Sequence, residues 1–171
     1  MTITRRDFTR GALALGTGLS VGFPAVLRRA YAAEPIKIGV PTVLSGGNVQ
    51  YGIQVKRACE LFEKETKAKG GLLGRPLEFI YEDTASDPAT AVRKAQKLVE
   101  KNGVKFLTGV VLSSEALAVS AKCPEWKVIF MSTINGVGSL TTTNFNRYFF
   151  RVNTSGPMGT RAVTLYLQNR P

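Results

Sequence analysis

The pattern of apolar and polar positions along the chain predicts that short strands alternate with longer helices from about residue 35 onward. Five short segments have the apolar content of strands, and they span residues 36–40, 77–81, 106–111, 128–131 and 148–152. The segments between them carry apolar residues every three or four positions, as an amphipathic helix does. Helices are expected at residues 49–69, from Pro88, from Ser113 or Ser114 to near Pro124, and at 156–168.

Strand–helix alternation of this kind predicts an α/β fold with a doubly wound parallel sheet. In such sheets, ligands bind at the carboxyl ends of the strands, close to the point where the strand order reverses. The loops after the first, third and fourth strands are therefore the expected place for a binding site.

The first 33 residues have the layout of an export signal. A basic start with Arg5 and Arg6 precedes a modestly apolar run at 11–23, and Ala30-Tyr31-Ala32 follows as a small-residue cleavage site. The run is too short and too rich in glycine to span a bilayer well. We expect residues 1–32 to be a signal peptide, with paired arginines typical of the twin-arginine route.

Charge and composition exclude several classes of function. The formal charge is +11, but residues 1–33 hold five arginines against one acid, and the remaining excess lies on helices that also carry acids. No nucleic-acid-binding signature accompanies it, so we expect no nucleic-acid partner. The chain has no histidine and two distant cysteines, Cys59 and Cys123. We therefore expect no catalytic residues, no metal site and no cofactor.

Several segments together resemble the type I periplasmic solute-binding proteins of ABC transporters, of the branched-chain amino-acid (Leu/Ile/Val) binding kind. They are Ile36–Val40 with Leu44-Ser45-Gly46, Tyr51-Gly52, Gly70–Leu77, Glu82-Asp83 with Ser86-Asp87-Pro88, Gly109–Ser114 and Met131–Thr141. Each segment is weak evidence alone, whereas their order and spacing over residues 35–155 are specific.

The resemblance implies two Rossmann-like lobes that close over a ligand. This chain would supply the first lobe, residues 33–152, and residues 153–171 would cross into a second lobe that is absent. Either the chain is a fragment or its gene is truncated.

The resemblance also implies which residues contact the ligand. Ser113 matches a serine that contacts the ligand's carboxylate, Ser114 lies beside it, and Val111 and Leu112 line the pocket. A helix N-terminus suits a carboxylate, although these serines could instead only cap the helix. The other expected ligand contacts are Tyr51, an aromatic at the helix start, and the loop residues Ile134, Asn135 and Gly136.

A glycine at position 136 departs from the usual pattern of amino-acid binders, so the ligand's identity stays open. The expected function is delivery of a small carboxylate- or amide-bearing ligand to the membrane permease of an ABC importer. We expect a monomeric periplasmic protein that is not an enzyme. The alternatives are a ligand-sensing ectodomain of the same fold and an exported Rossmann-like enzyme.

The sequence also predicts that Cys59 and Cys123 are not joined by a disulfide. Right-handed crossovers in a sheet of order 2-1-3-4 put their two helices on opposite faces. The sheet would then hold the cysteines much farther apart than the ~7 Å between Cα atoms that a disulfide allows.

Overall fold

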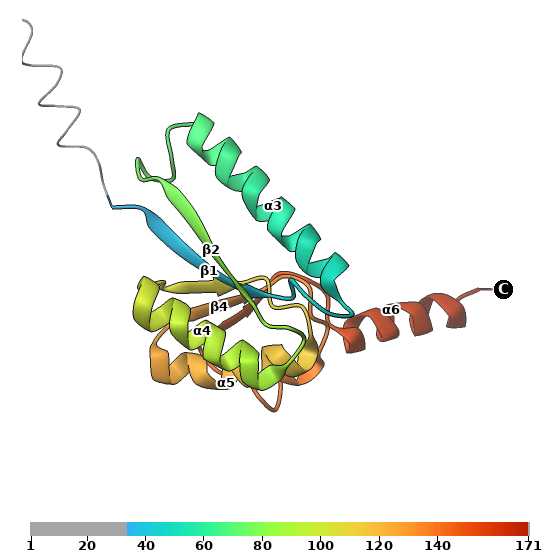
Figure 1. Cartoon of the computed structure of the whole chain (residues 1–171). Coiled ribbons are helices and arrows are strands. Elements are labelled where there is room, and N and C mark those ends of the chain that lie inside the picture. The colour runs from blue at the N-terminus through green and yellow to red at the C-terminus, as the bar shows by residue number, and fades with distance from the viewer. Residues whose placement is uncertain (1–33, 171) are drawn as a thin grey trace, which may run out of the picture. The chain divides into compact units, whose positions relative to one another are not determined.

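A five-stranded parallel sheet organises residues 34–170, the part of the chain that the computed structural model describes (Figure 1). Its strand order is β2-β1-β3-β4-β5. The strands are β1 (Ile36–Thr42), β2 (Leu77–Asp83), β3 (Phe106–Thr108), β4 (Ile129–Ser132) and β5 (Phe149–Arg151). The helices are α3 (Val49–Ala68), α4 (Pro88–Asn102), α5 (Ser113–Trp126) and α6 (Gly156–Gln168), with a short 3₁₀ helix, η1 (Gly138–Thr141), before β5. The predicted α/β fold is confirmed, and the predicted signal peptide lies outside the described residues.

Helices cover both faces of the sheet, as a doubly wound topology requires. The chain moves from β1 to β2 in one direction and from β2 to β3 in the other, so right-handed crossovers place α3 opposite α4 and α5 (Figure 1). Cys59 lies on α3 and Cys123 on α5, and both thiols are free. The prediction that they are not joined is therefore confirmed.

The hydrophobic core lies between the sheet and the α4–α5 layer. Its fully buried side chains include Leu98 of α4, Val119 of α5 and, from the strands, Leu107 and Phe130. Phe130 meets Phe149 of β5 edge to face, with ring centroids 5.4 Å apart, which is a favourable arrangement of two aromatic quadrupoles. The buried core thus lies mainly on the α4–α5 side of the sheet.

The strand β3 is shorter than the apolar run at 106–111 predicts. It ends at Thr108 because Gly109 takes a positive φ of 80°, a conformation that favours glycine. A Cβ at Gly109 would also lie 2.7 Å from Cγ1 of Val40 and 2.8 Å from Cγ1 of Val55. The apolar residues after Gly109 therefore form a buried connection to α5 and do not extend the strand.

The predicted start of α4 is confirmed in detail. Asp87 is the N-cap, its carboxylate accepts a hydrogen bond of 2.6 Å from the Thr90 amide, and Pro88 occupies the first turn. Gly103 closes the helix in the left-handed conformation.

The helix α5 continues past Pro124, where the sequence predicts its end. Proline has no amide hydrogen, so the carbonyl of Ser120, four residues earlier, loses its usual helical donor. Nδ2 of Asn146 donates to this carbonyl at 3.1 Å and to the Ser120 hydroxyl at 2.9 Å. A side chain from the loop before β5 therefore replaces the missing bond, and α5 extends to Trp126.

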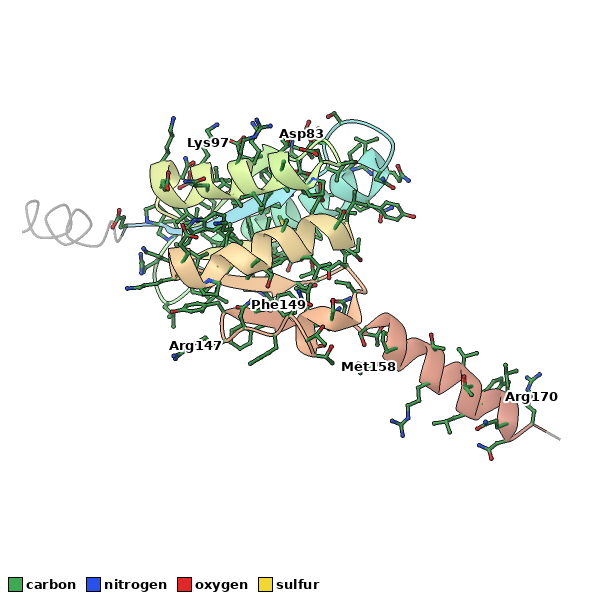
Figure 2. All side chains as sticks on the ribbon, turned by 90° about the horizontal axis from the view of Figure 1, so that it is seen from below. Asp83, Lys97, Arg147, Phe149, Met158 and Arg170 are labelled. Atoms are coloured by element: carbon green, nitrogen blue, oxygen red, sulfur yellow. The ribbon has the colours of Figure 1, made fainter. Side chains whose placement is uncertain are left out.

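No residue of the last described helix, α6, is buried. Figure 2 shows the α6 side chains from Met158 to Arg170 lying clear of the other elements. Met158, Val163, Leu165, Tyr166 and Leu167 are all at least half exposed. Among residues 34–170, no helix is both long and apolar enough to cross a membrane.

The Pro124–Asn146 arrangement gives a testable prediction about stability. Asn146→Ala should lower the free energy of unfolding by about 1–3 kcal/mol, because it leaves the buried Ser120 carbonyl without a donor. The measurement is urea unfolding followed by circular dichroism.

The matched test repeats the substitution in a Pro124→Ala background. Alanine restores the amide hydrogen at position 124, so Asn146→Ala should cost clearly less there. An equal cost in the two backgrounds would show that Asn146 does not compensate for the proline.

Candidate functional site

Three loops meet at the carboxyl edge of the sheet. The strands β1, β3 and β4 are parallel neighbours, so the loops that follow them, residues 43–48, 109–112 and 133–137, lie at the same edge. The strand order reverses between β1 and β3, because the chain leaves these two strands toward opposite faces. Such a reversal opens a crevice in which doubly wound proteins bind ligands.

The N-terminus of α5 lies at this edge of the sheet, and its polar groups are unused within the described residues. Leu112 is the N-cap, so Ser113 and Ser114 are the first two helical residues and neither occupies the capping position. Both serines are exposed, and within residues 34–170 neither hydroxyl makes a hydrogen bond. The first amides of a helix have no intrahelical acceptor, and they carry the positive end of the helix dipole. This turn can therefore donate several hydrogen bonds to an anion.

Glu115, in the same turn, points away from solvent. Its side chain is fully buried, and Oε2 accepts a 3.3 Å hydrogen bond from the Leu112 amide. Burial raises the pKa of the Glu115 carboxyl, and the hydrogen bond from the Leu112 amide and the nearby Thr84 hydroxyl offset only part of that effect. The carboxyl thereby fixes the backbone just before Ser113 from the inside.

The loop after β1 is held by a carboxylate at the end of β2. Oδ1 of Asp83 accepts from the amides of Leu44 and Ala85, both at 2.9 Å, and Oδ2 accepts from the Ser45 hydroxyl at 2.6 Å. Burial opposes ionisation of Asp83, but these hydrogen bonds outweigh it and lower the pKa of the carboxyl. The geometry of the loop thus depends on a charged side chain from the neighbouring strand.

Tyr51 lies in the first turn of α3, at the same edge, and its side chain is 44% exposed. The next residue, Gly52, brings the helix against the end of β1. A Cβ at Gly52 would lie 1.7 Å from the carbonyl oxygen of Val43, so no other residue allows this approach. The close packing of Gly52 against Val43 therefore fixes the position of Tyr51.

The loop after β4 is held by polar side chains from the end of β5 and from the residues just after it. The carbonyl of Asn135 accepts from Nη1 of Arg151 at 2.7 Å and from Nδ2 of Asn153 at 2.8 Å, and Arg151 also donates to the Val137 carbonyl. Asn135 is only 2% exposed and donates its side-chain amide to Ser132 at 2.7 Å. Its side chain therefore supports the loop from within, whereas Ile134 and Gly136 are partly exposed beside it.

A second concave region lies on the α3 face of the sheet. This hollow has a volume of about 530 Å³ and is lined mostly by apolar side chains, among them Val55 and Phe62 of α3, Phe106 of β3 and Met131 of β4. Leu61 and Phe62, which the periodicity places on an apolar stripe, are 58% and 50% exposed. The hollow offers few donors for a carboxylate, and α5 lies on the other face.

The described residues hold neither a metal-binding cluster nor an activated thiol. Within residues 34–170, no group of three histidine, cysteine, aspartate or glutamate side chains could hold a metal ion. Burial raises the pKa of the Cys59 thiol to about 11 and that of Cys123 to about 12, so neither cysteine is a reactive nucleophile at neutral pH.

The structure brings most of the sequence-predicted residues to one edge, and it adds four that the sequence did not single out as site residues. Ser113, Ser114, Val111 and Leu112 form the start of α5 and the approach to it. The additions are buried or partly buried polar side chains that hold the loops: Asp83, Glu115, Arg151 and Asn153. A charged residue within an apolar strand, as in Phe149-Phe150-Arg151, is the kind of signal that could have identified them.

Comparison with known proteins places the chain among binding proteins. A family model described as "Periplasmic binding protein" matches residues 35–170. The Leu/Ile/Val-binding protein of Escherichia coli K12 is 38% identical over 88 residues, which are 52% of this chain and 24% of that protein.

Two solved structures show the same similarity. The substrate-binding protein LivJ of a branched-chain amino acid transporter from Streptococcus pneumoniae, in complex with isoleucine, has a TM-score of 0.66 and 26% identity over 71% of this chain. A solute-binding protein of an ABC transporter from Rhodopseudomonas palustris, in complex with 3,4-dihydroxybenzoic acid, has a TM-score of 0.63 and 26% identity over 71% of this chain. The match covers 34% and 32% of these two proteins, so the chain spans about a third or less of each of the three relatives.

The Asp83 bonds predict a pH-dependent contribution to stability. Asp83→Asn should lower the free energy of unfolding by about 1–2 kcal/mol at neutral pH, because the hydrogen bonds from Leu44, Ala85 and Ser45 lose a charged acceptor. The pKa of Asp83 in the folded protein is below the ordinary 3.8, so this contribution is present above pH 3.8 and is lost as the pH falls through the folded value.

The measurement is urea unfolding of both proteins as a function of pH. Glu100→Gln, which removes one exposed negative charge from α4, is the matched control and should have little effect. A difference between Asp83→Asn and the wild type that stays constant down to the lowest pH would contradict the assignment.

Proposed function

The chain belongs to the periplasmic binding protein family, and we propose from this that it forms the first, ligand-holding lobe of an exported solute-binding protein. Its ligand would be a small carboxylate, delivered in the periplasm to the membrane permease of an ABC importer. The observation that carries the proposal is the N-terminus of α5, where exposed Ser113 and Ser114 and the first helical amides have no partner in the described part of the chain.

The ligands of the two structural relatives support a carboxylate as the recognised group. Isoleucine and 3,4-dihydroxybenzoic acid differ in size, shape and polarity, and the carboxylate is what they share. A helix N-terminus recognises that group through backbone amides, largely independently of what is attached to it. The same fold can therefore serve aliphatic and aromatic acids, and the rest of the crevice would select between them.

The remaining site residues would contribute shape and selectivity. Tyr51 would pack against the body of the ligand, and Val111 and Leu112 would form the apolar wall next to the carboxylate. Ile134 and Gly136 would approach the ligand from the loop after β4. Asn135 would act mainly by shaping that loop, since its side chain is buried against Ser132.

The chain would be organised in three parts. Residues 1–32 would be a signal peptide of the twin-arginine type and residues 33–152 the first lobe. Residues 153–171, which include α6, would cross toward a second lobe supplied by a longer polypeptide. An α6 whose apolar side chains stay exposed within residues 34–170 supports this assignment, as do relatives that are about twice as long. We expect the protein to act as a monomer.

Binding without a catalytic step is supported by the relatives and by the site. The relatives described above are binding proteins, and the site offers hydrogen-bond donors beside apolar surface. A sensor or an enzyme built on the same lobe has no separate observation in its favour.

The direct test measures binding of isoleucine and 3,4-dihydroxybenzoate to the full-length protein by calorimetry. The amide analogue of each probe, which lacks the negative charge, is the matched ligand control. Ser113→Ala should weaken binding of a carboxylate by about 1–3 kcal/mol, the scale of a lost bond to a charged group, and should leave the melting temperature nearly unchanged.

Thr143→Ala, which removes an exposed hydroxyl from the loop between η1 and β5, is the control variant and should bind as the wild type does. Equal binding by the wild type and Ser113→Ala would show that the serine does not contact the ligand. Equal binding of acids and amides would contradict carboxylate recognition.

A further inference from the structure

Glu115 is a buried acid without a cationic partner, placed in the turn that would receive the ligand. Its side chain is 0% exposed, Oε2 accepts from the Leu112 amide at 3.3 Å, and Oε1 has no hydrogen-bond partner. None of the described ion pairs includes it. A fully buried carboxylate in this position would be uncompensated, which is costly in a protein interior.

The groups that surround Glu115 do not supply positive charge. The charged side chains that act on it are Asp87, at the N-cap of α4, and Asp83, at the end of β2, and both are acidic. The hydroxyl of Thr84 also faces the carboxyl, but Oγ1 of Thr84 makes no hydrogen bond of good geometry. The Thr84 amide donates to the Thr42 carbonyl at 3.0 Å, and the buried hydroxyl of Thr42 likewise has no partner.

Burial and the two acids therefore favour the protonated form of Glu115, and the direction of its pKa shift, upward, agrees with this geometry. A proton on Oε1 would also give that oxygen a hydrogen to donate, and the unpartnered Oγ1 of Thr84 is an acceptor facing it.

We propose that Glu115 is a specificity-determining residue that stays a neutral carboxylic acid in the ligand-bound protein, and so keeps the N-terminus of α5 positive enough to accept an anion. This proposal rests on the proposed function. Glu115 does not touch the ligand; it acts through the electrostatic field of the turn that begins at Ser113.

The physical reason is that a negative charge in the first turn would offset the helix dipole. The buried carboxyl accepts from the Leu112 amide, directly before the exposed serine turn, so an ionised Glu115 and a bound carboxylate would repel each other at short range. The repulsion is reciprocal: a bound anion must raise the proton affinity of Glu115, and protonation of Glu115 must raise the affinity for the anion. Ligand binding should then take up protons, and affinity should fall as the pH rises through the pKa of Glu115.

The first experiment tests the neutral acid without any ligand. Urea unfolding is measured from pH 4.5 to mildly alkaline pH for the wild type, Glu115→Gln and Glu125→Gln. Glutamine keeps the shape and the acceptor toward Leu112 and mimics the protonated acid. The folded pKa of Glu115 is raised above 4.5, so the wild type should lose stability relative to Glu115→Gln as the pH rises from 4.5 through the folded value.

Glu125→Gln removes an exposed carboxylate from the same helix and should follow the wild type. Parallel curves for the wild type and Glu115→Gln would show that Glu115 has no raised proton affinity, and would overturn the proposal.

The second experiment measures proton uptake on binding. Calorimetry with isoleucine and 3,4-dihydroxybenzoate is repeated in two buffers of different ionisation enthalpy. At pH values above the pKa that Glu115 has in the unliganded protein, the wild type and Glu125→Gln should take up protons, with affinity falling by up to about tenfold per pH unit. Glu115→Gln should show neither proton uptake nor this pH dependence.

The outcomes separate the two levels of inference. Binding of the probes with no proton uptake, or with equal uptake by Glu115→Gln, overturns the role of Glu115 and leaves the proposed function intact. Binding of neither probe contradicts the proposed function for these acids, and with it the role of Glu115 in selecting them.

Discussion

Buried polar groups must find hydrogen-bond partners, and that requirement determines the form of the carboxyl edge. Three loops end a parallel sheet there, and none of them has a strand ladder to satisfy its amides and carbonyls. The carboxylate of Asp83 satisfies the loop after β1, and Arg151 and Asn153 satisfy the loop after β4. The amide of Leu112 finds the carboxyl of Glu115. With these partners supplied from the interior, the outward-facing donors at the start of α5 stay unused.

A binding site of this type is built in two layers with opposite roles. In the proposed site, the outer layer consists of exposed hydroxyls and free amides, which a ligand would use. The inner layer is made of side chains that hold the backbone still, so that a ligand need not order the loops when it arrives. Charge differs within the inner layer: Asp83 is ionised beneath one loop, whereas the surroundings of Glu115 oppose ionisation beneath the other.

The sequence alone predicted the order of the first four strands and the start of each α-helix in the part of the chain that the structure describes, since these follow from local periodicity, capping residues and the handedness of crossovers. It also predicted a ligand site at the α5 start, and in the structure Ser113 and Ser114 are exposed there. It did not predict which polar residues turn inward. Asn135 looks like a ligand contact in the sequence, yet its burial depends on Arg151 and Asn153, which reach it only in the folded sheet. The end of α5 was missed for the same reason, because Asn146 compensates for Pro124 from a distant loop.

The bond between Asn146 and Ser120 has a consequence for the order of events during synthesis. The donor follows its acceptor by 26 residues, so the ribosome must add that many residues before the last turn of α5 can be completed. At typical elongation rates this delay is on the order of seconds, far longer than a helix takes to form. During that interval the end of α5 remains a frayed segment on the nascent chain. The helix therefore becomes complete only when the loop before β5 has emerged, which couples its maturation to the arrival of the final strand.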